Sequence, residues 1–115
     1  MRGANRSQRP ITTYAEFWPY YLQEHAKSAT RNIHFIGTFA AGACVAAGVV
    51  TGATWYFPLA AVSGYGPAWF AHFFIEKNRP ATFTHPLWSL VSDFRMAWCW
   101  LTGRLARELD KAGVS

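Results

Sequence analysis

The stretch from Ile33 to Ile75, IHFIGTFAAGACVAAGVVTGATWYFPLAAVSGYGPAWFAHFFI, contains no Asp, Glu, Lys or Arg. Its length is about twice the ~20 apolar residues with which one helix crosses a membrane. The stretch is interrupted at Thr51-Gly52-Ala53, a sequence typical of a turn. We therefore predict two helices, over 33–51 and 55–76, that form a hairpin in a membrane. A buried hairpin inside a soluble helical bundle is the alternative.

Small side chains recur on both predicted helices and include Gly37, Gly48 and Gly64. In membrane hairpins such residues let two helix backbones approach closely, because lipid provides no hydrophobic force between helices. The pattern predicts tight contact between the two halves of the apolar stretch.

The charged residues all lie outside the apolar stretch. Only 15% of the 115 residues are charged, against about 25% in an average soluble domain, while 17% are aromatic. The net charge is +5, and Lys and Arg occupy both outer flanks. Positive flanks favour the cytoplasmic side of a membrane, so we expect both termini in the cytoplasm, at the bacterial inner membrane. No compact basic face is present, which argues against a nucleic-acid partner.

The flanks of the hairpin have helical signals of their own. We expect residues 1–11 to form a mobile basic arm and residues 12–115 a single helical membrane domain. Thr13 and Glu16 have the spacing of a capping box and open an aromatic helix suited to a membrane interface. A last helix should run over 86–111. The predicted class is all-α: a small helical membrane protein with a central two-helix hairpin and flanking interfacial helices.

Four histidines lie near the ends of the predicted segments: His25, His34, His72 and His85. His34 precedes the hairpin turn by about as many residues as His72 follows it, so at 1.5 Å per residue both lie roughly 27 to 30 Å from the turn. The hairpin should thus return them to one face, where His25 and His85 can join them. The pattern predicts a metal site made of these four side chains.

The ligand type alone leaves the metal open, because imidazole binds iron, zinc, copper and nickel. Glu76, one helical turn after His72, is a candidate ligand or a hydrogen-bond acceptor for an imidazole N–H. A salt bridge from Glu76 to Lys77 or Arg79 is the alternative. Asp93 has the pattern of an ordinary helix-surface charge.

Two blocks of the chain resemble the 2-hydroxy fatty acid dioxygenase-like family. They are EFWPYYLQEHAKSATRNIHFIGT, residues 16–38, and WFAHFFIEKNRPATFTHPLWSLVSDFRM, residues 69–96. The resemblance implies a helical, membrane-associated protein with iron(II) as cofactor. Zn²⁺ stays open as the other option, because imidazole binds it as well. It also implies that the four histidines are the metal ligands. The fungal members are longer, which puts part of the substrate channel in doubt.

The activity implied by the resemblance is the shortening of 2-hydroxy fatty acids by one carbon, with O2 as co-substrate and release of carbon dioxide. We expect Lys77 or Arg79 to pair with the substrate carboxylate, and Trp69, Phe73 and Phe74 to line the acyl path. Each of these residues is equally suited to anchor the protein at a membrane interface, which is the alternative. The alternative function is a noncatalytic membrane protein that binds lipid or assists assembly and holds a structural histidine–metal site. The oligomeric state stays open, a homo-oligomer included.

Overall fold

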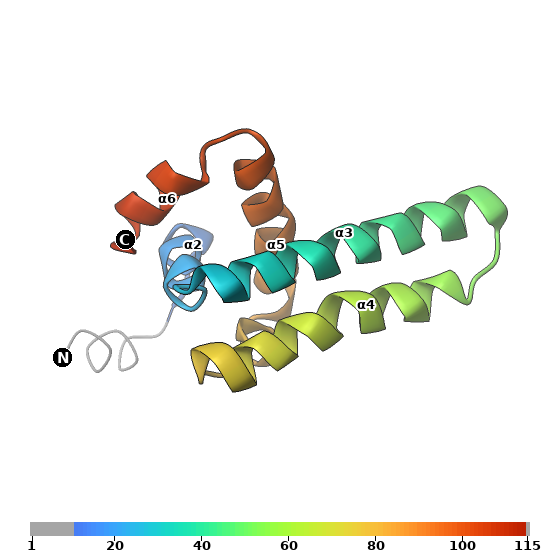
Figure 1. Cartoon of the computed structure of the whole chain (residues 1–115), viewed down its shortest axis with the longest axis horizontal. Coiled ribbons are helices and arrows are strands. Elements are labelled where there is room, and N and C mark those ends of the chain that lie inside the picture. The colour runs from blue at the N-terminus through green and yellow to red at the C-terminus, as the bar shows by residue number, and fades with distance from the viewer. Residues whose placement is uncertain (1–10, 115) are drawn as a thin grey trace.

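The computed structural model describes residues 11–114, which form five α-helices, one π-helical turn and one 3-10 turn, with no strand (Figure 1). The predicted all-α class is confirmed. Apart from Ile11, which packs against the core, the predicted basic arm lies outside the described residues. In chain order the elements are α2 (Tyr14–Gln23), α3 (Ser28–Thr51), α4 (Tyr56–Ala71), η1 (His72–Glu76), η2 (Ala81–Phe83), α5 (Pro86–Leu101) and α6 (Leu105–Lys111).

Helices α3 and α4 form the predicted hairpin. Figure 1 shows α3 and α4 side by side and antiparallel, joined by the turn after Thr51. Gly52 ends α3 in the left-handed conformation, with φ of 74°, which glycine adopts without steric cost. α3 begins five residues before the predicted start, at Ser28. α4 changes into the π-helical turn η1 at His72, so the predicted second helix, 55–76, is present in two parts.

Small residues bring the two hairpin helices together, as the sequence predicted. A Cβ atom placed on Gly37 of α3 would lie 2.9 Å from the backbone oxygen of Ser63 in α4. A Cβ atom on Gly48 would lie 2.9 Å from the ring of Phe57, near the turn. Close approach of α3 and α4 therefore depends on the absence of side chains at these glycines, and it fixes how far His34 stands from His72.

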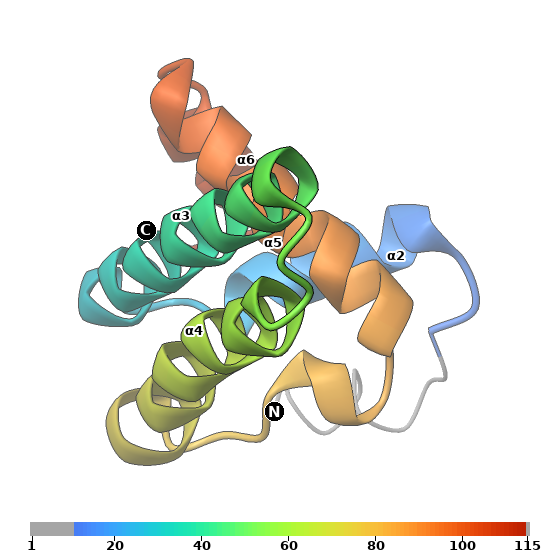
Figure 2. The same cartoon turned by 90° about the vertical axis from the view of Figure 1, so that its right-hand side faces the viewer.

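The remaining helices pack across one end of the hairpin (Figure 2). Their buried side chains form the hydrophobic core together with Phe35 of α3. Phe17, Tyr21 and Leu22 of α2 are fully buried against Met96 of α5. The capping box of Thr13 and Glu16 is present at the start of α2. The aromatic side chains that suggested an interfacial helix thus pack largely inside the molecule.

The predicted continuous helix over 86–111 is wrong. α5 ends at Leu101 and α6 starts at Leu105, because Gly103 takes a left-handed conformation with φ of 75°. The backbone N–H of Arg104 then donates to the carbonyl of Cys99, which closes the end of α5. After this bend, Trp18 Nε1 of α2 donates to Glu108 of α6 at 2.9 Å, and α6 folds back over α2.

One helix of the described residues, α3, is long and apolar enough to cross a membrane. Only 28% of the most apolar part of this helix is buried inside the molecule, so most of these residues are not covered by the rest of the chain. The second predicted crossing does not meet the same criterion, because the α-helical part of α4 is 16 residues long. α3 is therefore the candidate membrane-crossing helix of the described residues.

Candidate metal centre

Three of the four histidines meet at the end of the hairpin where the flanking helices pack. His25 follows α2, His34 lies in the second turn of α3, and His72 opens η1. Nε2 of His25 lies 3.0 Å from Nε2 of both His34 and His72, and the last two are 3.4 Å apart. The three side chains are 1%, 4% and 2% exposed, so the cluster is closed to bulk water.

The other ring nitrogen of two of these histidines contacts an acceptor. Nδ1 of His25 lies 2.7 Å from the carbonyl oxygen of Tyr21, one helical turn earlier. Nδ1 of His72 lies 2.7 Å from Oδ1 of Asn78. A carbonyl oxygen only accepts hydrogen bonds, so both histidines must carry their proton on Nδ1. Their Nε2 atoms are then bare lone pairs directed into the cluster.

The carboxyl of Asp93 in α5 faces Nδ1 of the third histidine, His34. Its Oδ1 lies 3.6 Å from Nδ1 of His34 and also accepts a hydrogen bond from the hydroxyl of Tyr21. Burial raises the pKa of Asp93 to about 7, while the hydrogen bond from Tyr21 acts in the opposite direction. The carboxyl therefore lies between the side chains of Tyr21 in α2 and His34 in α3, at the edge of the cluster.

The cluster has the chemistry of a cation site. Burial, together with the neighbouring His34 and His72, lowers the pKa of His25 well below its usual value, so this ring is neutral at pH 7. Two neutral rings with bare Nε2 atoms 3.0 Å apart share no proton, and their lone pairs repel. A metal ion removes this conflict. Nitrogens bound at about 2.0–2.1 Å from one ion stand roughly 3 Å apart in neighbouring coordination positions, so the residues fit a metal.

Local backbone geometry brings Asn78 to His72. The π-helical turn η1 ends at Glu76. The next residue, Lys77, has a left-handed φ of 65°, and the backbone N–H of Asn78 donates to the carbonyl of His72. The Asn78 amide nitrogen donates to the backbone and side-chain oxygens of Glu24, each at 3.1 Å. These two donor contacts orient the amide, so that its oxygen faces the imidazole. Single π-helical turns occur frequently at functional sites.

The structure does not bring His85 into this group. Its Nδ1 lies 2.8 Å from the hydroxyl of Thr84, and its ring stacks on Trp88 with a centroid distance of 5.6 Å. Two aromatic rings lie between His85 and the cluster. Phe17 contacts both His85 and Tyr21, and Tyr21 contacts His25. Among the described residues, the group able to hold a metal is His25, His34 and His72.

The other predicted site residues lie around the cluster. Glu76 accepts a hydrogen bond from the backbone N–H of Lys27 at the start of α3, so the acceptor for His72 is Asn78. Lys77 and Arg79 are exposed on either side of Asn78. The predicted acyl-path residues contact other aromatic rings: Trp69 and Phe73 both contact Phe83, and Phe74 contacts Phe70. Phe73 and Phe74 remain exposed.

Sequence reasoning missed Asn78 and misjudged Asp93. Asn78 comes six residues after His72, and no regular helical spacing links the two; the π-turn and the left-handed Lys77 create their contact. The sequence does contain an indication that Asp93 is buried. It is the single acidic residue between Glu76 and Glu108 and lies within an aromatic helix, where a carboxyl group needs a buried partner.

A comparison with known protein families finds a match over most of the chain. The family model described as 2-hydroxy-palmitic acid dioxygenase Mpo1-like matches residues 11–105, which include all four histidines, Asn78 and Asp93. No curated protein and no solved structure matches the chain.

Proposed function

The chain belongs to the Mpo1-like family of 2-hydroxy-palmitic acid dioxygenases, and on that premise we propose that it is an iron(II)-dependent dioxygenase that shortens 2-hydroxy fatty acids by one carbon. The observation that carries this proposal is the meeting of three buried imidazoles, His25, His34 and His72, through Nε2 atoms 3.0 to 3.4 Å apart. A site with three protein ligands leaves coordination positions for substrate and O2.

The proposed reaction converts a 2-hydroxy acid and O2 into the acid one carbon shorter, carbon dioxide and water. This equation balances in atoms and electrons, so no external reductant is required. Bound iron(II) supplies the redox chemistry with O2 that amino-acid side chains lack.

The protein contributes orientation and exclusion of water. The carbonyl of Tyr21 and the side chain of Asn78 hold the protons of His25 and His72 on Nδ1, which keeps both Nε2 atoms available as ligands. The low exposure of the rings keeps bulk water from competing at the metal. Lys77 and Arg79, exposed beside Asn78, are the proposed partners of the substrate carboxylate.

The membrane position is part of the same proposal. The hairpin of α3 and α4 would lie in the bilayer with the histidine end at the cytoplasmic surface, where a fatty-acid carboxylate also resides. The apolar, mostly uncovered surface of α3 supports this placement. Cysteine labelling of residues near Thr51 tests it, because these residues should react only with reagent on the side opposite the termini.

A second function has one observation in its favour. The near-complete burial of the three histidines is also what a closed structural metal site requires, as in a noncatalytic lipid-binding or assembly protein. Such a protein would retain its metal tightly and consume no O2 with any 2-hydroxy acid.

Oxygen uptake by iron-loaded protein separates these functions. Protein purified without oxygen and loaded with iron(II) should consume O2 when 2-hydroxyhexadecanoic acid is added and form pentadecanoic acid. Hexadecanoic acid is the control, since it lacks the hydroxyl that would chelate the metal beside the carboxylate. Folded, iron-loaded protein that is inert towards 2-hydroxy acids of short, medium and long chains would contradict the proposal.

A further inference from the structure

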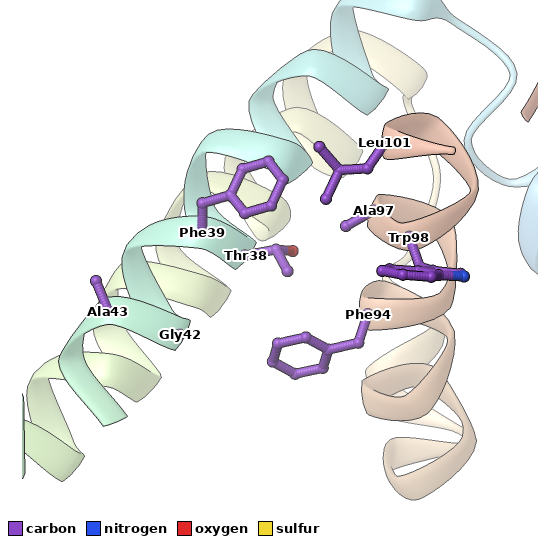
Figure 3. Close-up of a pocket in the computed structure, with 8 residues that line it drawn as sticks. All are labelled: Thr38, Phe39, Gly42, Ala43, Phe94, Ala97, Trp98 and Leu101. Carbon is purple, nitrogen blue, oxygen red and sulfur yellow. The ribbon is translucent and has the colours of Figure 1, made fainter. Parts of the chain in front are cut away.

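An apolar groove of about 370 Å³ opens between α3 and α5 (Figure 3). Its volume falls in the range of about 300–1,000 Å³ that is usual for small-molecule sites. Thr38, Phe39 and Gly42 line it from α3, and Phe94, Ala97 and Trp98 line it from α5. The groove is open, since Trp98 and Phe94 keep 61% and 49% of their surface exposed.

The groove begins beside the histidine cluster. Thr38 follows His34 by four residues on α3, and Ala97 follows Asp93 by four residues on α5. Residues four apart share one face of a helix, so each helix carries a cluster residue and, one turn later, a groove residue. His34 and Asp93 lie 3.6 Å apart, so this pair joins the two helices where the groove starts.

The residues that line the groove favour an alkyl chain as its ligand. Thr38 is the single polar residue among those that line the groove, so a polar ligand or a peptide backbone would leave most of its hydrogen bonds unmet there. An alkyl chain has no such requirement and would cover aromatic surface that is otherwise exposed. Its polar head would lie at the histidine end, since the imidazoles and Asp93 supply the polar groups.

We propose that this groove holds the alkyl chain of a 2-hydroxy fatty acid, and that Gly42 sets how long a chain it accepts. The proposal rests on the proposed function for the identity of the head group. Gly42 lies two helical turns from His34, roughly 12 Å along α3. A Cβ atom added to Gly42 meets nothing within 4 Å, so the space above this glycine is open to the tail of a ligand.

Photolabelling tests the groove without requiring turnover. The probe is 2-hydroxyhexadecanoic acid with a diazirine near its terminal carbon, added to the iron-loaded full-length protein in lipid nanodiscs. Labelled residues are then identified by mass spectrometry. We expect labels on groove residues of α3 and α5 that unlabelled 2-hydroxyhexadecanoic acid competes away. Labels confined to α4 and η1, or spread over α3 and unaffected by the competitor, would overturn the proposal.

Substitution of Gly42 gives a second test of the proposal. Gly42→Leu should reduce competed labelling about tenfold or more, because the added side chain fills the groove, while a probe based on 2-hydroxyoctanoic acid should be little affected. Ala40→Leu is the matched control, since Ala40 is exposed on the same helix and does not line the groove. Ala43→Leu, at an exposed lining residue, replaces Gly42→Leu if that variant does not fold. Unchanged labelling in the folded groove variants would overturn the proposal.

The outcomes separate this inference from the proposed function. Groove labelling in an iron-loaded protein that consumes no O2 would leave the alkyl site standing and remove the dioxygenase activity. Oxygen uptake with 2-hydroxyhexadecanoic acid, combined with unchanged labelling in the groove variants, would leave the dioxygenase activity standing and remove the alkyl site in the groove.

Discussion

Nε2 of His25 lies 3.0 Å from Nε2 of His72, although 47 residues separate them in the chain. The contact joins the end of α2 to the π-helical turn that follows α4. Because each ring holds its proton on Nδ1, the two nitrogens face each other as lone pairs. A cation bound by both nitrogens would relieve this repulsion, and the cluster of His25, His34 and His72 could hold one.

Single alanine substitutions test which histidines bind the metal. His25→Ala, His34→Ala and His72→Ala should each lower the iron content from about one ion per chain to near zero, because only two imidazoles then remain. His85→Ala is the matched control and should keep the full content, since His85 packs on Trp88 outside the cluster. Metal analysis of the folded variants decides. Loss of iron in His85→Ala would mean that the cluster needs a fourth histidine.

Removal of Asn78 should weaken metal binding without removing a ligand. Asn78→Ala deletes the acceptor for Nδ1 of His72, and loss of such a partner typically costs about 10–100-fold in metal affinity. Asn78→Asp keeps an acceptor oxygen and should retain more of the affinity. Arg79→Ala alters an exposed neighbour and should leave the affinity unchanged. Competition with a chelator measures all three, and equal affinities for Asn78→Ala and Arg79→Ala would rule out this role.

The hydroxyl of Tyr21 should contribute more to folding than that of Tyr14. Tyr21→Phe removes the donor to the buried carboxyl of Asp93 and should cost about 1–3 kcal/mol of unfolding free energy. Tyr14→Phe removes a hydrogen bond to Ser92, a neutral partner, and should cost about 0.5–1.5 kcal/mol. Denaturant titration of both proteins without metal gives the comparison. A smaller loss for Tyr21→Phe than for Tyr14→Phe would contradict the account of Asp93.

Two glycines of α3 should respond in opposite ways to alanine. Gly37→Ala places a Cβ atom 2.9 Å from the backbone oxygen of Ser63, so α3 and α4 must separate and the protein should lose stability. Gly42→Ala meets nothing within 4 Å and should gain about 0.5–1 kcal/mol from its higher helix propensity. Thermal unfolding of both variants tests the tight hairpin. Equal melting temperatures would show that the helices are not held this closely at Gly37.

The sequence predicted the hairpin and three members of the cluster because these follow from distance along a helix. An apolar stretch long enough for two helices, with a turn at Thr51-Gly52-Ala53, must return His34 to the level of His72. His25 lies nine residues before His34, and a short connection keeps it near. Counting residues was therefore sufficient for this part of the site.

The remaining features depend on single backbone angles and on side-chain packing. The left-handed Lys77 turns Asn78 back towards His72, and the left-handed Gly103 ends α5 ten residues before the predicted helix end at 111. His85 follows the second hairpin helix closely in the sequence, but its ring stacks on Trp88 and not on the cluster. Counting residues cannot predict this side-chain orientation. Burial of Asp93 likewise follows from the packing of α5 on α2 and α3.

Release of the carboxyl carbon tests the central claim most directly. The measurement uses 2-hydroxyhexadecanoic acid with carbon-13 at its carboxyl carbon, O2, and the iron-loaded protein in lipid nanodiscs, with His34→Ala as the control. We predict that labelled carbon dioxide and unlabelled pentadecanoic acid form in equal amounts with the unaltered protein, and that neither forms with His34→Ala. Label that stays in the fatty acid, or equal release by His34→Ala, would contradict a dioxygenase built on His25, His34 and His72.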